Sequence, residues 1–164
     1  MPSFTRITHF VRNALIAAAL SLGAGAAFAN DADTVVYRAE SGFEDSVFAL
    51  ESAIIDRGLV IDYRSFIGEM LARTGADVGS DVQVFENAQI FLFCSAVLSR
   101  KMMEEDPANV SLCPWGVFVY ALPGESDASH VGFRRLVSGG ATEGAKQEIE
   151  ALLDEIAREA AGVE

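Results

Sequence analysis

The sequence predicts an α+β fold, a two-layer sandwich in which a mostly antiparallel sheet of about four to five strands has helices packed on one face. Two observations support this prediction. Short apolar segments alternate with amphipathic helical ones, but they are too few and too short for a doubly wound parallel sheet. The region expected to fold, residues 30–164, is long enough for one α+β domain with an ordinary hydrophobic core.

The first half of this region alternates two strands with two helices. Weak alternation of apolar and polar residues predicts a strand at residues 34–39. Ser41-Gly42-Phe43-Glu44 has the spacing of a capping box and opens a helix that ends at Gly58. Residues 59–63 are predicted to form a second strand and residues 65–73 a short helix. The residues expected to face the core from the longer helix are Phe43, Val47, Leu50 and Ile54.

The second half contains the two most apolar strands, residues 88–94 and 112–122. A brief helix between them ends before Asp106-Pro107. Residues 131–136 are predicted as an edge strand, because two consecutive arginines at its end discourage pairing with another chain. The last helix begins after a glycine pair, where Thr142 can cap it. Its expected core residues are Ala145, Ile149, Leu152, Leu153, Ile156 and Ala160.

Residues 1–29 have the three parts of a cleavable signal peptide. Three basic residues without any acid precede an apolar run at residues 14–27, and Ala27-Phe28-Ala29 forms a small-x-small cleavage site. The apolar run is shorter than the roughly 20 residues that cross a bilayer. The sequence therefore predicts cleavage, no stable membrane insertion afterwards, and a periplasmic or secreted protein.

The mature chain is strongly acidic. Its leader holds two of the 12 Lys and Arg residues and none of the 24 Asp and Glu residues, so cleavage changes the formal charge from −12 to −14. Such a surface repels nucleic acids and anionic lipid headgroups, which excludes a nucleic-acid partner. It suits a soluble protein or one that docks on a basic partner.

The stretch from Phe91 to Val119 carries the most specific pattern. An apolar strand ends at Cys94, a short helix contains Met103, Asp106-Pro107 follows, and Pro114 opens another apolar strand. In this order and spacing the stretch resembles the bacterial family known as domain of unknown function 302. Counting its looser flanks, the resemblance spans residues 35 to about 136.

The resemblance implies a compact α+β domain that often forms a homodimer and has no established activity. Two features depart from the family pattern. Ser95-Ala96 replaces the family's Asn-Pro after the cysteine. The family's second cysteine, when present, follows the proline; here Trp115 stands there and Cys113 precedes Pro114.

Cys94 and Cys113 are the only cysteines, and three interpretations of them stay open. A disulfide between them would close a loop of about 20 residues and stabilise the fold by about 3 kcal/mol. A redox-active or metal-binding pair is the functional interpretation, although neither a CxxC motif nor an adjacent lysine or histidine activates either thiol. The third interpretation is two buried free thiols.

Other chemistry-bearing residues are few. His130 is the only histidine left after cleavage, and we expect a surface imidazole in a polar turn. Trp115 is interpreted as a core or dimer contact, or else as a residue that stacks on a ligand. The candidate ligand-binding residues are Cys94, Ser95, Met103, Cys113 and Trp115, and a metal, if bound, would use Cys94, Cys113 and His130.

No catalytic residue and no cofactor is predicted, since the sequence has no phosphate-binding glycine loop, HExxH or CxxCH motif. The leading hypothesis is a non-catalytic exported domain that binds a small ligand or a periplasmic protein partner, a second copy of itself included. The alternative is a thiol-based redox or metal-handling protein that uses Cys94 and Cys113. A third hypothesis is an accessory subunit of an exported complex.

Overall fold

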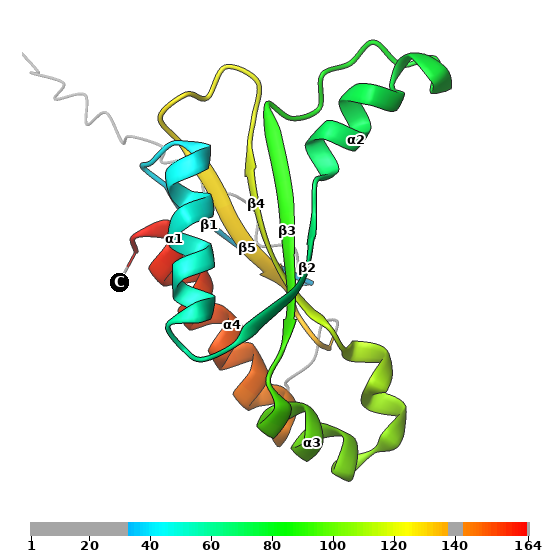
Figure 1. Cartoon of the computed structure of the whole chain (residues 1–164), viewed down its shortest axis with the longest axis vertical. Helices are drawn as coiled ribbons and strands as arrows, with labels where there is room; N and C mark the ends of the chain where they lie inside the picture. Colours follow the sequence, from blue (N-terminus) through cyan, green and yellow to red (C-terminus); the bar gives the residue numbers. More distant parts are fainter. Residues whose placement is uncertain (1–32, 138–142, 164) are drawn as a thin grey trace, which may run out of the picture.

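A computed structural model of the chain describes residues 33–137 and 143–163 (Figure 1). The predicted signal peptide and the Thr142 cap lie outside these residues. The elements follow one another as β1 (Thr34–Ala39), α1 (Phe43–Ile55), β2 (Val60–Ser65), α2 (Ile67–Thr74), the 3-10 turn η1 (Ala76–Val78), β3 (Asn87–Cys94), α3 (Ala96–Glu105), the 3-10 turn η2 (Pro107–Leu112), β4 (Trp115–Ala121), β5 (Ser129–Arg134) and α4 (Ala145–Ala161).

The five strands form one antiparallel sheet in the order β1-β5-β4-β3-β2, which confirms the predicted α+β class. One strand assignment is wrong. β5 was expected at an edge, but it pairs with β1 on one side and β4 on the other. The two arginines do not blunt it, because Arg134 is its last residue and Arg135 lies beyond it, while Ser129 to Phe133 are all buried.

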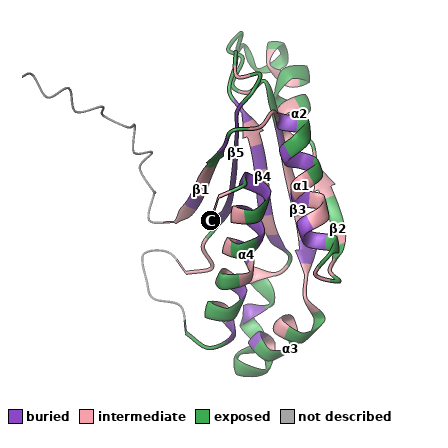
Figure 2. Cartoon of the chain, turned by 90° about the vertical axis from the view of Figure 1, so that its left-hand side faces the viewer, coloured by how far each residue is buried: buried purple, intermediate pink, exposed green. Residues whose placement is uncertain are grey.

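α1 and α4 lie against each other and cover one face of the sheet (Figure 2). As predicted, the four residues of α1 named above are buried. The predicted face of α4 is buried as well, except that Leu152 is only half-buried and Ala157 and Ala161 join it. From the strands, large side chains meet these helices: Phe91, Phe93, Trp115, Val117, Val119, Val131 and Phe133.

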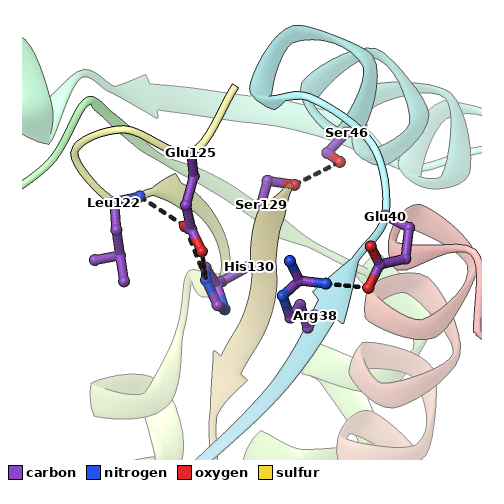
Figure 3. A network of polar contacts seen from close by, with 7 residues as sticks. All are labelled: Arg38, Glu40, Ser46, Leu122, Glu125, Ser129 and His130. Carbon is purple, nitrogen blue, oxygen red and sulfur yellow. Dashed lines mark hydrogen bonds and ion pairs between the residues drawn. The ribbon is translucent and has the colours of Figure 1, made fainter. Parts of the chain in front are cut away.

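The start of α1 differs from the predicted capping box. Gly42 is the cap residue, and no side chain bonds to the first backbone amides. The Ser41 hydroxyl instead lies 2.8 Å from that of Ser46, and Ser46 accepts a hydrogen bond of 2.7 Å from Ser129 of β5 (Figure 3). A buried pair of hydroxyls thus fastens the first turn of α1 to the sheet, which satisfies both groups without water.

α3 and η2 form a separate layer beyond the end of β3, joined to α4 (Figure 1). Ser95 caps α3 by accepting the Leu98 amide hydrogen at 3.4 Å. A carboxylate oxygen of Glu105 accepts the amide hydrogen of Ala145 at 3.0 Å, at the beginning of α4. No helix in the described ranges is long and apolar enough to cross a membrane.

Candidate functional site

One face of the sheet has no helix over its centre. α1 and α4 lie against the opposite face, and α2 contacts mainly the beginning of β3. We call the uncovered side the open face. Alternation along each strand assigns these residues to it: Val36 and Arg38 of β1, Tyr63 of β2, Ala88, Ile90 and Leu92 of β3, Gly116, Phe118 and Tyr120 of β4, and His130, Gly132 and Arg134 of β5.

Aromatic rings form a row across the middle of the open face. Phe118 and Tyr120 are stacked with centroids 6.1 Å apart, and Tyr120 stacks on His130 at 4.7 Å. Phe118 lies over Gly132, where an added Cβ would come within 2.7 Å of its ring and 2.3 Å of the backbone oxygen of Val35. A side chain at Gly132 would therefore displace the row, so this glycine is what allows the ring to lie flat on β5.

His130 is not the surface residue that was expected. It belongs to β5 and is 1% exposed. Its Nε2 lies 3.1 Å from Oε2 of Glu125, and the same oxygen accepts the Leu122 amide hydrogen at 3.0 Å, which closes the turn between β4 and β5 (Figure 3). The polar stretch before His130 resembled a turn in sequence, but β1 supplies it with a pairing partner from the other end of the chain.

The Glu125 carboxylate is held in its charged form. The hydrogen bond from Leu122 is the largest effect and lowers its pKa; burial opposes it with a smaller rise, and His130 and Arg38 lower the pKa further. Burial also raises the pKa of Tyr120, and the charge of Glu125 adds to that rise. The raised pKa keeps Tyr120 in its neutral form beside the charged Glu125 at the rim of the row.

Charge is divided between the two sides of the molecule. Arg38, Arg134 and His130 are assigned to the open face, and the Glu125 carboxylate lies at its rim against His130. Arg38 pairs with Glu40 just after β1 (Figure 3). The helix side carries the acids Glu44, Asp45, Glu51, Glu148, Glu150, Asp154, Glu155 and Glu159.

A hollow of about 280 Å³ lies at the end of the open face nearest η2. Leu92 pairs with Gly116, and one step beyond the last β4–β5 pair Arg134 comes opposite the same glycine. Gly116 has no side chain, and Leu92 and Ile90 lean over it, with Leu92 Cδ2 3.1 Å and Ile90 Cγ2 3.2 Å from where a Cβ would lie. The lining residues are Ile90, Leu92, Ser111, Leu112, Pro114, Trp115, Gly116, Phe118, Arg134, Arg135, Leu136 and Leu153.

Cys94 and Cys113 are joined as a disulfide, with Cα atoms 6.7 Å apart. Of the three interpretations, this arrangement fits the disulfide. Both cysteines are half-buried, and the bond connects the end of β3 to the residue before Pro114, across α3 and η2. In the described part of the chain, no group of three or more His, Cys, Asp or Glu residues could hold a metal ion.

The other predicted ligand-binding residues are dispersed. Trp115 is 2% exposed and meets Phe93 edge-on at 6.4 Å, so it belongs to the core while also lining the hollow. Ser95 caps α3, and Met103 packs half-buried against the core from the same helix. Of the predicted set, only Trp115 lines the hollow; Cys113 lies two residues earlier in the chain.

The open-face residues were missed because their signal is indirect. Glycines inside the apolar strands β4 and β5 mark places where another group approaches the backbone closely. Gly116 and Gly132 are such positions, but which ring or ligand approaches them depends on the register between β4 and β5.

The chain has relatives of known fold. The family model described as domain of unknown function DUF302 matches residues 35–161. A similar solved structure is the crystal structure of the uncharacterized conserved protein DUF302 from Bacillus stearothermophilus, with a TM-score of 0.61 and 16% identity, covering 77% of this chain and 97% of that chain. At this identity the likeness shows the fold alone. No curated protein matches the chain.

Proposed function

This chain belongs to the DUF302 family of domains of unknown function, and we propose a role for it from its own surfaces. We propose that it is an exported, non-catalytic binding domain that binds a second copy of itself through the open face. The observation that carries the proposal is an aromatic sheet face with no helix over its centre, in a strongly acidic chain. The half-buried rings of Phe118 and Tyr120 and the exposed ring of Tyr63 contribute apolar surface to this face, and apolar patches mark interaction sites in soluble proteins.

The size of the open face supports a second copy of the chain as its binding partner. Five strands of about six residues cover about 24 Å by 20 Å, or roughly 500 Å² in projection. Ile67 of α2 adjoins this face beside Ile90, Phe118 and Tyr120. A standard interface buries about 800 Å² per partner, so the open face and its rim are of the right order.

The charge distribution supports a second copy rather than a highly charged partner. Two copies that meet through their open faces keep the acids of α1 and α4 on the outside, where solvent screens them. Approach through the helix side would instead bring two acidic surfaces together. The central pairs across the interface would be apolar and aromatic, which is the composition of interface cores.

Export is supported by the pattern of residues 1–29 and by the disulfide, since such bonds persist in oxidising compartments. The absence of catalytic motifs in the sequence favours binding over turnover.

Sedimentation equilibrium of the protein tests the proposal. Tyr63 lies on the open face and is 63% exposed, while Phe48 of α1 is 73% exposed on the helix side. We expect a dimer that Tyr63→Asp converts to a monomer, because the new charge would be buried in the interface. Phe48→Asp is the matched control and should remain dimeric. A wild-type monomer at all concentrations would refute the proposed self-association.

A second candidate function is thiol chemistry, and the half-buried disulfide is the observation that favours it. The Ser99 hydroxyl lies 3.6 Å from the sulfur of Cys113. If the purified protein reduced or oxidised a thiol substrate at a rate abolished by Cys94→Ser, this role would replace the non-catalytic one.

A further inference from the structure

We propose that the hollow beside Gly116 is a binding site for a small molecule with an apolar body and one carboxylate. This inference deepens the proposed binding function and rests on it, because it names the ligand of one end of the open face. The hollow, about 280 Å³, lies at the small end of the range for small-molecule sites.

The floor of the hollow is apolar and made by the sheet. Leu92, Ile90 and Phe118 line it together with Gly116. An added Cβ at Gly116 would lie 3.1 Å from Leu92 Cδ2 and 3.2 Å from Ile90 Cγ2. These two side chains therefore close over Gly116, and a flat ring or a short alkyl chain of a ligand would rest on their methyl groups.

One wall of the hollow is cationic. Arg135 is already opposed by Glu150, with Nη1 and Oε2 3.5 Å apart. Arg134 also lines the hollow, and it makes no ion pair with any residue in the described ranges. In a chain with a net charge of −12 an arginine left without a carboxylate is notable, because its planar guanidinium matches a carboxylate with two parallel hydrogen bonds.

Trp115 lies at the inner boundary of the hollow, together with Leu153 of α4. Its indole Nε1 is sealed from solvent and has no acceptor among the residues that the structure describes. A ligand in the hollow therefore does not reach this N–H, but it would lie beside a residue whose fluorescence can report binding.

These features select the chemical class. One uncompensated arginine suits a single carboxylate, whereas a phosphate group carries more charge than it balances. The apolar floor requires a hydrophobic remainder, which excludes small inorganic anions. A monocarboxylate with an aromatic ring or short alkyl chain satisfies both requirements.

The test uses the single tryptophan of the chain as its probe. The protein is titrated with 3-phenylpropionate and with its neutral counterpart 3-phenylpropionamide, followed by Trp115 fluorescence and by calorimetry. We expect the acid to change the fluorescence and to bind about 10-fold or more tightly than the amide, as charge-assisted hydrogen bonds predict. Inorganic phosphate should leave the fluorescence unchanged.

Two variants separate the contributions of charge and shape. Arg134→Gln should lower the affinity for the acid to that for the amide, whereas Arg73→Gln, a change at an exposed arginine of α2, should leave the preference intact. Gly116→Ala should weaken both compounds, because its methyl group would push Leu92 and Ile90 into the hollow. Circular dichroism of each variant checks that it folds.

The proposal is overturned if the acid and the amide bind equally, if Arg134→Gln keeps the preference, or if calorimetry detects no binding. Sedimentation of the same samples keeps this result apart from the proposed dimer. A monomer that still prefers the acid would refute self-association and leave the ligand site standing, and a dimer without ligand binding would do the reverse.

Discussion

Removal of the Cys94–Cys113 disulfide should lower the free energy of unfolding by an amount set by the length of the loop that the bond closes. The two cysteines are 19 residues apart, and cross-linking a loop of that length restricts the unfolded chain by about 3 kcal/mol at 25 °C. Domains of this size have total stabilities of about 5–15 kcal/mol, so the loss is a large fraction. The fold should survive it, because the Glu105–Ala145 and Lys101–Glu148 contacts still fasten α3 to α4.

Urea unfolding followed by circular dichroism measures this loss. We expect a reductant to lower the urea concentration at the unfolding midpoint of the wild-type protein by about 1.5 M. This shift is the loss of about 3 kcal/mol divided by a usual slope of about 2 kcal/mol per M urea. The double variant Cys94→Ser, Cys113→Ser should unfold at that lower midpoint and should not respond to the reductant. If the reductant leaves the wild-type midpoint unchanged, the bond either does not form or does not constrain the chain, and the reasoning is wrong.

Three further predictions concern single residues. Gly132→Ala should cost about 3 kcal/mol in urea unfolding, because its Cβ would collide with backbone and with Phe118, whereas Gly116→Ala, which meets only the ends of two side chains, should cost less than about 1 kcal/mol. The pKa of Glu125 is lowered in the folded protein. The stability that its carboxylate contributes is therefore present above the ordinary pKa of 4.5 and is lost as the pH falls through the lowered pKa. The stability difference between wild type and Glu125→Gln should therefore shrink with acidification over that window, and a constant difference would contradict the assigned role. N-terminal sequencing of protein from a periplasmic fraction should begin at Asn30; an intact Met1 there would refute cleavage.

The local elements of the fold were predictable from the sequence because their signals are local. The strand at residues 34–39 and the buried face of α1 follow directly from the spacing of apolar residues. The assignments that were wrong depend on contacts between distant segments. β5 is internal because β1 pairs with it, and the serine of the expected capping box bonds to another side chain instead.

The candidate site was harder to predict for the same reason. The sequence drew attention to the cysteines and Trp115, because they mark the most specific motif. The open face is instead defined by which residues of β4 and β5 lie opposite each other, and a one-residue shift of β5 along β4 would turn Arg134 to the helix side. Register of this kind is set by the whole sheet and leaves no local signature.

The central claim is that the open face is buried against a second copy, and side-chain footprinting measures that directly. Hydroxyl radicals oxidise exposed aromatic rings, and both Tyr63 and Phe48 are exposed in the single chain. As the protein concentration is raised through the monomer–dimer transition, oxidation of Tyr63 should fall while that of Phe48 stays constant. Constant oxidation of Tyr63 together with protection of Phe48 would place the interface on the helix side and contradict the account.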